Sequence, residues 1–460
     1  MKTYQDLTEA GLSEETRADF IEAAIRDYKT SQVYTTAVAA LEYARGLNPT
    51  ITQYKKLLYT ITGKAVPDNY SANHKCASNF FYRFINQENQ YLLGNGVAFN
   101  EDGTKDVLGG DEFDGKLQKA GFMSLWGGVS YGFFNNGRVD VFSALEFIPL
   151  YDEEDGAMKA GIRFWQIADN KPLRATLYEL DGYTDYMRTK DKKMSPISVN
   201  GSAIGKRAYI VNIVSTPADG IILYNGQNYP TFPIVPLYAN PLRQSELVGR
   251  RTKIDAYDLI ESGFANDLDD ASMIYWTIQN AGGMDDVDLA KFVERMKTVK
   301  AAVVDDEGAR AEAHTMDVPY QAREAALSRL ENDIIADFMA MDVKEVSAGN
   351  VTATQIEASY QDLDLKTDLF EYEVNAFIKG LLAVAGVDDK PIFPKRSKIT
   401  NQTEQTQMVL SSAGVLDDET IIRHLPFLSV DEIDTVLQRK AEEEYNRVTS
   451  VTEEGRAAEV

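Results

Sequence analysis

Residues 319–386 read PYQAREAALSRLENDIIADFMAMDVKEVSAGNVTATQIEASYQDLDLKTDLFEYEVNAFIKGLLAVAG, and this stretch decides the architecture of the chain. It predicts two long helices joined by a short loop rich in Ser, Gly and Asn. In the second helix the residues of one face recur at alternating spacings of four and three: Ile356, Tyr360, Leu363, Thr367, Phe370, Val374, Phe377 and Leu381. The first helix repeats the pattern with Leu327, Leu330, Ile334, Phe338 and Met341. Because a 3.5-residue repeat of about four heptads needs a long partner surface, we predict a helical hairpin that takes part in an assembly.

Composition indicates an ordered protein that does not bind nucleic acid by neutralising its phosphates. The length of 460 residues suggests roughly three domains. The 71 acidic and 47 basic residues give a formal net charge of −24, which disfavours binding by phosphate neutralisation. The same acidity suits a surface along which DNA slides, and it also suits simple solubility.

Cysteine content and hydropathy limit the cellular context. Cys76 is the only cysteine, so an internal disulfide and a thiolate metal cluster are excluded. We therefore expect synthesis in an intracellular compartment. The N-terminal residues lack the apolar core of a signal peptide, and no apolar run reaches the length of a membrane span. No membrane partner is expected.

Local patterns divide the rest of the chain into helical and strand-rich segments. Helices are expected within 13–45 and 70–93, strands from about 97 to 235, a helix within 245–280, a small mixed module over 284–318, a short strand after Pro391 and further helices beyond 400. Acidic residues 152–155 and the Asp181-Gly182 pair mark hairpin turns. Thr352 and Gln355 fit a capping box at the start of the second long helix.

Recognisable catalytic chemistry is missing from this sequence. The three histidines, His74, His314 and His424, share no ligand spacing. The stretch GSAIGKR at 201–207 resembles a P-loop, but it has three residues between its glycines and an Arg where Ser or Thr holds magnesium, so a surface turn is favoured. The acidic cluster at 152–155 lacks the alternating ligands of a calcium loop. We expect no catalytic residue, no cofactor and no metal.

Four ordered stretches carry a family resemblance. They are NFFYRFINQENQYLLGNGVAF at 79–99, ALEFIPLYDEEDGAMKAGIRFWQ at 144–166, FPIVPLYANPLRQSELVGRRTKIDAYDLIESGFANDLDD at 232–270, and VSAGNVTATQIEASYQDLDLKTDLFEYEVNAFIKGLL at 346–382. Each stretch alone is a loose pattern, whereas their order and spacing are more specific. With them the chain resembles the portal proteins of tailed bacteriophages, in the SPP1-type branch.

The resemblance implies an α+β, ring-forming portal fold. Its implied parts are an α/β wing over 1–244, a stem helix over 245–283, a small α/β clip over 284–318, a second stem helix over 319–341, a tunnel loop over 342–352, a long helix with a return strand over 353–399, and an α-helical crown with a tail over 400–460. Twelve copies would form a ring at one capsid vertex, through which double-stranded DNA is packaged and ejected without sequence specificity. Implied partners are the terminase, the head–tail adaptor, and the major capsid and scaffolding proteins. The implied location is the virion, with the host cytoplasm during assembly.

Three groups of residues are the expected functional sites under this resemblance. The tunnel-loop group, which is expected to project towards the channel axis, is Asp342, Val343, Lys344, Glu345, Val346, Ser347 and Asn350. The acidic group on the long helix, which would flank the channel with negative charge, is Glu357, Asp362, Asp364, Asp368 and Glu371. The clip group, expected to contact the adaptor and the terminase, is Lys297, Lys300 and Arg310.

Two alternative functions remain open from the sequence. One is another head–tail connector or virion structural protein. The other is a nucleotide-driven DNA motor subunit, which would have to use Lys206 in the 201–207 turn.

Overall fold

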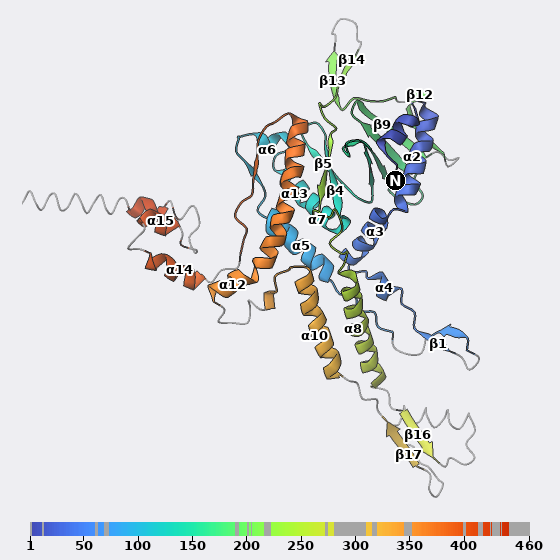
Figure 1. The fold of residues 1–460 in the computed structure, drawn as a ribbon, viewed down its shortest axis with the longest axis vertical. Coiled ribbons are helices and arrows are strands. Elements are labelled where there is room, and N and C mark those ends of the chain that lie inside the picture. The colour runs from blue at the N-terminus through green and yellow to red at the C-terminus, as the bar shows by residue number, and fades with distance from the viewer. Residues whose placement is uncertain are drawn as a thin grey trace, which may run out of the picture.

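The computed structural model combines a body of helices and strands with two helices that extend away from it (Figure 1). It describes residues 2–11, 13–59, 63–68, 73–188, 193–199, 202–203, 205–215, 222–271, 275–279, 310–314, 320–344, 352–398, 402–412, 417–423, 425, 433 and 435–440. In the helices of this part of the chain, no segment is both long and apolar enough to span a membrane.

The body contains two antiparallel sheets, each with its own helical cover. The larger sheet has the order β10-β9-β8-β7-β6, with strands Met194–Pro196, Gly182–Arg188, Arg174–Glu179, Met158–Trp165 and Phe147–Tyr151. Helix α1 (Tyr4–Glu9) and helix α2 (Glu14–Lys29) cover it, and α2 buries the face that carries Ile21, Ala24 and Ile25. The smaller sheet has the order β15-β4-β5, with strands Ile234–Tyr238, Val129–Phe134 and Val139–Ser143. Both hairpins predicted from the acidic turn and the Asp-Gly pair are confirmed.

Helix α7 (Glu112–Gly127) corrects the prediction of strands throughout 97–235. Three glycines, which are poor helix formers, hid its helical period. Gly121 is required, because a β-carbon there would collide with Asn89 and Leu93 of α5 (Phe80–Leu93). Helix α5 itself begins ten residues later than expected.

The two long helices of the opening stretch exist, but they do not share one seam. The first is α10 (Tyr320–Asp337), and the second is divided at Tyr360 into α12 (Ala353–Ser359) and α13 (Gln361–Ala385). The predicted capping box at Thr352 is confirmed. Helix α10 packs beside α8 (Arg251–Ala271), whereas α13 lies across β15 and β4. The predicted hairpin is therefore wrong, and the seam of α13 is buried by its own chain's sheet.

Two glycines permit the close approach of α13 to that sheet. On β4, a β-carbon at Gly132 would collide with the ring of Phe377, and on α13 a β-carbon at Gly380 would collide with Val235. Every member of the predicted α13 seam is buried, from Ile356 to Leu381. The smaller sheet and α5 thus supply the partner surface for α13, whereas Ile356, Tyr360 and Leu363 at the start of the seam pack against Met341 and Tyr91.

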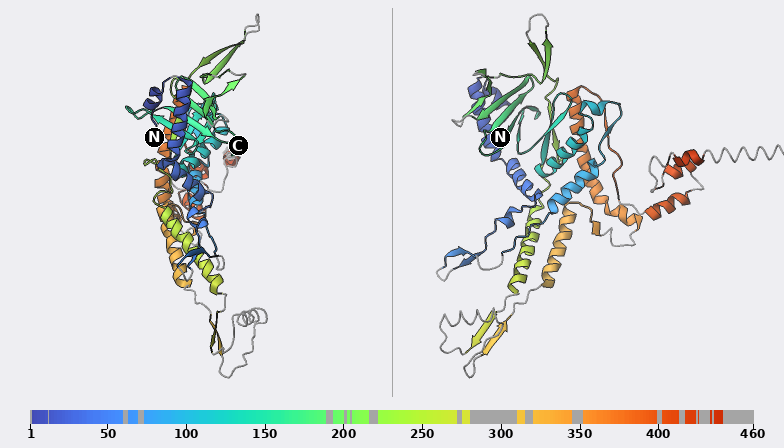
Figure 2. Two further views of the ribbon diagram at one scale, coloured as in Figure 1. Left: turned by 90° about the vertical axis from the view of Figure 1, so that its right-hand side faces the viewer. Right: turned by 180° about the vertical axis from the view of Figure 1, so that it is seen from behind.

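Shorter elements complete the described structure. These are α3 (Gln32–Ala44), α4 (Pro49–Thr52), β1 (Leu57–Tyr59), β2 (Ala65–Pro67), β3 (Ala98–Phe99), α6 (Thr104–Val107), β11 (Ser198–Val199), β12 (Ser202–Ala203), β13 (Ile210–Ser215), β14 (Ile222–Gln227), β16 (Tyr275–Gln279), β17 (Arg310–His314), β18 (Pro391–Ile392), α14 (Gln402–Ser411) and α15 (Asp418–Arg423). The short strand expected after Pro391 is β18, which pairs with β3. The helix expected as far as residue 280, and the stem helix expected as far as 283, were predicted too long, because α8 ends at Ala271 and residues 275–279 form strand β16. Strand β16 pairs with β17 beyond the ends of α8 and α10, as both views in Figure 2 show.

Candidate functional site: the lower end of α13 and its charged surroundings

The described ends of the 342–352 loop are both tied to the body. Before the loop, Met341 is buried in a small apolar cluster with Ile356, Tyr360 and Leu363 from beyond it. The amide of Gln87 also donates a hydrogen bond to the carbonyl of Met341 at 3.3 Å. The loop therefore starts and finishes at one packed point, which limits how far its ends can move apart.

Three of the predicted loop residues lie within the described structure. Asp342 accepts a hydrogen bond from the backbone N–H of Lys344 at 2.9 Å, and Val343 is exposed. The Lys344 ammonium lies 2.6 Å from a carboxylate oxygen of Glu331 on α10. Glu345, Val346, Ser347 and Asn350 fall outside the described residues.

The acidic residues of α13 are balanced by a basic segment that follows the helix. Asp364 lies 2.5 Å from the ammonium of Lys398 and accepts a hydrogen bond from Tyr91 at 2.7 Å. Burial tends to raise the pKa of Asp364, but Lys398, Tyr91 and Arg396 outweigh it and the pKa is lowered. The guanidinium of Arg396 lies 2.8 Å from Asp368 and 2.6 Å from Glu371. Only Glu357 and Asp362 of the predicted acidic group are exposed with no such partner described here, so helix composition overstated the free negative charge.

Lys366, which the sequence presents as a surface charge of α13, is buried in an ion cluster. Its side chain is 9% exposed, and its ammonium lies 2.5 Å from Glu88 on α5 and 2.9 Å from Glu246 ahead of α8. Arg250 lies 3.0 Å from the same oxygen of Glu246, and Asn240 donates to the other at 2.9 Å. The two carboxylates thus share two cations in a site from which water is largely excluded.

The pKa values of the two buried carboxylates are shifted in opposite directions. Burial, the largest influence, raises the pKa of Glu88 to about 7, although Lys366 opposes it. Burial also tends to raise the pKa of Glu246, but Lys366 and Arg250 together outweigh it and lower the pKa. Lys366 and Glu246 are therefore the firmly charged pair, and Glu88 is the group nearest to protonation at neutral pH.

This ion cluster also holds the end of α10. Arg250 donates to the carbonyl of Asp337 at 2.7 Å, and its guanidinium lies over the ring of Phe338. Met339 follows with a φ of +50°, and the N–H of Ala340 bonds back to the carbonyl of Ile335. This is a Schellman termination with a non-glycine residue in the left-handed position. The cluster consequently joins α5, α8, α10 and α13 at the point where the loop begins.

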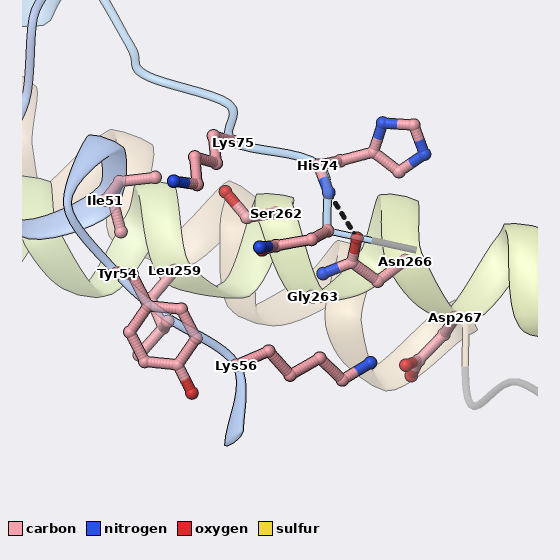
Figure 3. Close-up of a pocket in the computed structure, with 11 residues that line it drawn as sticks. Ile51, Tyr54, Lys56, His74, Lys75, Leu259, Ser262, Gly263, Asn266 and Asp267 are labelled. Atoms are coloured by element: carbon pink, nitrogen blue, oxygen red, sulfur yellow. Dashed lines mark hydrogen bonds between the residues drawn. The ribbon is translucent and has the colours of Figure 1, made fainter. Parts of the chain in front are cut away.

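A second polar site lies along α8, where it holds the segment that precedes α5. Asp258 is fully buried, accepts from the side chain of Asn48 at 2.7 Å and accepts from the backbone of Ser78 at 3.0 Å. Burial raises the pKa of Asp258 despite these donors. Beside it is a hollow of about 190 Å³, lined by Ile51, Tyr54, Lys56, Asn73, His74, Lys75, Leu259, Ser262, Gly263, Asn266 and Asp267 (Figure 3).

The remaining sequence candidates are engaged in ordinary surface contacts. Lys206 lies 2.8 Å from Glu179 and 2.6 Å from Asp181, and Arg207 pairs with Asp185. Asp152 is at the β6–β7 turn, where Lys159 and Gln5 bind it. Within the described residues, no group of three or more acidic, His or Cys side chains is placed to hold a metal ion.

The predicted clip residues are barely covered by the structure. Arg310 begins β17, and nothing further is described of its side chain. Lys297 and Lys300 lie outside the described residues.

The ion cluster and the Asp258 site were not predicted from the sequence, although the sequence contains a signal for each. Lys366 directly precedes Thr367 of the buried seam, and Glu88 lies within the aromatic helix α5. Both positions are charged residues inside apolar helix faces. Asp258 ends the IDAYD segment of the third resembling stretch, but nothing local indicates that Asn48 and Ser78 meet it.

Comparison with known proteins gives a family match over most of the chain. The model of the family described as "Phage portal protein, SPP1 Gp6-like" matches residues 42–446. A portal protein of Clostridium phage phiCD119 is 25% identical over 417 residues, which cover 84% of this chain and 88% of that protein. The portal protein of Bacillus phage SPP1 is 22% identical over 438 residues, covering 86% and 81% respectively.

Solved structures give a weaker likeness. A chain in "Neck of native GTA particle computed with C12 symmetry" aligns with a TM-score of 0.42 and 11% identity, covering 76% of this chain and 90% of that one. A chain in "Virion of native gene transfer agent (GTA) particle" aligns with a TM-score of 0.43 and 13% identity over the same shares. These similarities are too low to support an argument about assembly.

Proposed function

The chain belongs to the SPP1 Gp6-like family of phage portal proteins and has the function of a portal, and on that premise we propose how its elements build a DNA channel. Copies of the chain, twelve in number, form a closed ring at one vertex of the capsid. Each copy uses one face to bind a different face of the next, as closed rings require. The observation that carries the proposal is the family match over residues 42–446.

The described elements divide naturally into the parts of such a ring. Residues 1–244 form the wing, α8 and α10 form the stem, and β17 belongs to the clip over 284–318. Strand β16 lies within the range expected for the stem helix, and because it pairs with β17 we assign it to the clip as well. The long helix with its return strand occupies 353–399, and α14 and α15 belong to the crown. Support for the stem comes from α8 and α10, which pack side by side and extend from the body (Figure 1).

The 342–352 loop is the part proposed to meet DNA. Its described ends are held together by the cluster of Met341, Ile356 and Tyr360, and this supports the proposal that the loop is directed at the channel from one fixed point. Duplex DNA carries one negative charge per roughly 1.7 Å of axis, so a surface that must let it slide needs few free cations. Pairing of Lys344 with Glu331 and of Arg396 with Asp368 and Glu371 fits that requirement.

In this proposal the chain supplies no catalysis, and the terminase provides the chemical energy. The head–tail adaptor, the capsid protein and the scaffolding protein are the other proposed partners. The rival motor function would need Lys206 for nucleotide phosphates, and Glu179 and Asp181 already bind that ammonium.

Imaging and loop shortening test the proposal. Electron microscopy of the purified protein should show rings with a central channel, and a stable monomer at all salt concentrations would refute the ring. Deleting residues 346–350 should leave rings intact but impair DNA packaging or retention. The matched control deletes residues 168–172 from the β7–β8 turn and should affect neither. Unchanged packaging in the loop deletion would refute the assignment of this loop to the channel.

A further inference from the structure

The described residues of 53–76, which are 53–59, 63–68 and 73–76, belong to an arm that leaves the body after α4 and returns towards α5. It carries the β1–β2 hairpin, whose two strands pair only with each other among the described residues. An isolated two-stranded hairpin is at best marginally stable in water. The hairpin stands away from the body in Figure 1, so its own chain supplies little surface to support it.

The returning limb of the arm is fixed on α8 by a matched set of hydrogen bonds. Backbone N–H groups of His74, Cys76 and Ser78 donate to side chains of α8 at positions 266, 262 and 258, at 2.6, 2.9 and 3.0 Å. Two residues of an extended chain span about 6.6 Å, and four residues of a helix span about 6 Å along its axis. Every second backbone amide of the arm therefore lies opposite every fourth side chain of α8. Figure 3 shows the first of these bonds. The fold thus holds the arm in one place.

The outward side of the arm is apolar and basic. Tyr54 is 52% exposed and Leu57 is 47% exposed, and Leu259 of α8 adds a third exposed apolar side chain at 51%. Residues 53–76 contain four lysines and one aspartate, whereas the whole chain has a formal charge of −24. A basic apolar surface on an acidic protein is complementary in charge to another copy of the same chain.

The position of α10 identifies which part of that copy can receive the arm. Side chains 258, 262 and 266 of α8 face the arm, whereas Lys253 and Asp267 contact Asp337 and Arg323 of α10. At 3.6 residues per turn these two sets of side chains lie on different sides of α8. In each subunit α8 therefore lies between α10 on one side and the arm on the other. In a ring of identical subunits, the arm at one end of the row meets α10 at the start of the next.

The free side of α10 suits a close approach. The side turned away from α8 exposes four small or short residues, Ala325, Ser328, Asn332 and Ala336, with Gln321 near the start of the helix. We propose that the arm of each subunit packs, through Tyr54 and Leu57, on this face of α10 in a neighbouring copy. The inference rests on the proposed ring and names one of its contacts.

Cysteine pairs test the contact directly. In a Cys76→Ser background, Leu57→Cys and Ala325→Cys are combined, and the purified protein is treated with a short bis-maleimide. The expected result is a ladder of covalent multimers under denaturing conditions. The control pair joins Leu57→Cys with Ile167→Cys, because Ile167 is 82% exposed on the β7–β8 turn, away from this row. It should give no ladder.

Maleimide labelling of Leu57→Cys alone provides a second measurement. The residue should label readily in dissociated subunits and lose that labelling in assembled rings. If rings form without the ladder, or if Leu57→Cys stays reactive in the rings, the arm contact is refuted but the proposed portal ring is not. The arm would then be assigned to a different partner. Failure to form rings at all overturns the ring proposal and the arm contact together.

Discussion

Replacing Lys366 with methionine should destabilise the subunit in a pH-dependent manner. The ammonium group lies 2.5 Å from Glu88 and 2.9 Å from Glu246, whose side chains are 2% and 5% exposed. Arg250 still compensates Glu246 in the variant, so Glu88 is left as a buried carboxylate without a cation. Removing one partner of a buried ion pair costs about 3–5 kcal/mol. That cost applies when the remaining charge stays ionised. Because Glu88 can take up a proton instead, we expect the loss in the free energy of unfolding to reach only about 1.4 kcal/mol at pH 8, one pH unit above its pKa of about 7.

The direction of the pH dependence follows from the pKa of Glu88. Burial raises it to about 7, above the ordinary value of about 4.3 for glutamate. The folded state therefore keeps a proton that the unfolded state has released, and stability falls as pH rises from about 4.3 to 7. Loss of Lys366 raises this pKa further. The cost of Lys366→Met should be small near pH 5, where Glu88 is protonated, and about 1.4 kcal/mol larger at pH 8.

Urea unfolding at pH 5, 7 and 8, followed by circular dichroism, measures this cost. Lys379→Met on the exposed side of the same helix is the matched control and should change stability by no more than about 0.5 kcal/mol. Adding Glu88→Met to Lys366→Met should recover most of the loss, because an apolar replacement removes the uncompensated charge. A Lys366→Met cost equal to that of Lys379→Met, or one that does not grow with pH, would refute the reasoning.

Two further predictions concern the packing of α13 and the anchoring of the arm. Gly132→Ala should destabilise the body by about 1–3 kcal/mol in urea unfolding, because the new β-carbon collides with Phe377. The control Gly115→Ala places its β-carbon in open space and should not destabilise the protein. Equal effects of the two substitutions would contradict the close approach of α13 to β4. Asp258→Ala leaves the donors of Asn48 and Ser78 without their acceptor and should cost about 1–3 kcal/mol. It should also speed trypsin cleavage within residues 53–76, and an unchanged cleavage pattern would show that α8 does not hold the arm.

Most elements of this fold follow from local patterns, and the exceptions have physical causes. The Asp181-Gly182 hairpin was predictable because its turn needs a residue with positive φ, and Gly182 has a φ of +136°. Helix α7 was not, because its three glycines resemble turn signals, whereas Gly121 serves a close contact with α5. The break at Tyr360 also escaped prediction, since the heptad spacing continues across it without interruption.

The proposed channel region was only partly predictable for a similar reason. Sequence order and spacing located the 342–352 loop and the family. They could not indicate that Arg396 and Lys398 return to neutralise Asp364, Asp368 and Glu371, because pairing across about 30 residues depends on the path of the chain. Net charge counted along one helix is therefore a poor guide to the charge of the surface it contributes to.

By itself, the sequence determined that α13 has one face of buried side chains and that the chain has an acidic surplus. Periodicity specifies which side of a helix must be covered, but it carries no information about what covers it. Only the tertiary structure decided that β4 and β15 cover α13, that α8 is the partner of α10, and that Lys366 is inside. Those outcomes depend on contacts between residues far apart in sequence, such as Lys366 with Glu88 and Glu246, and no local pattern encodes them.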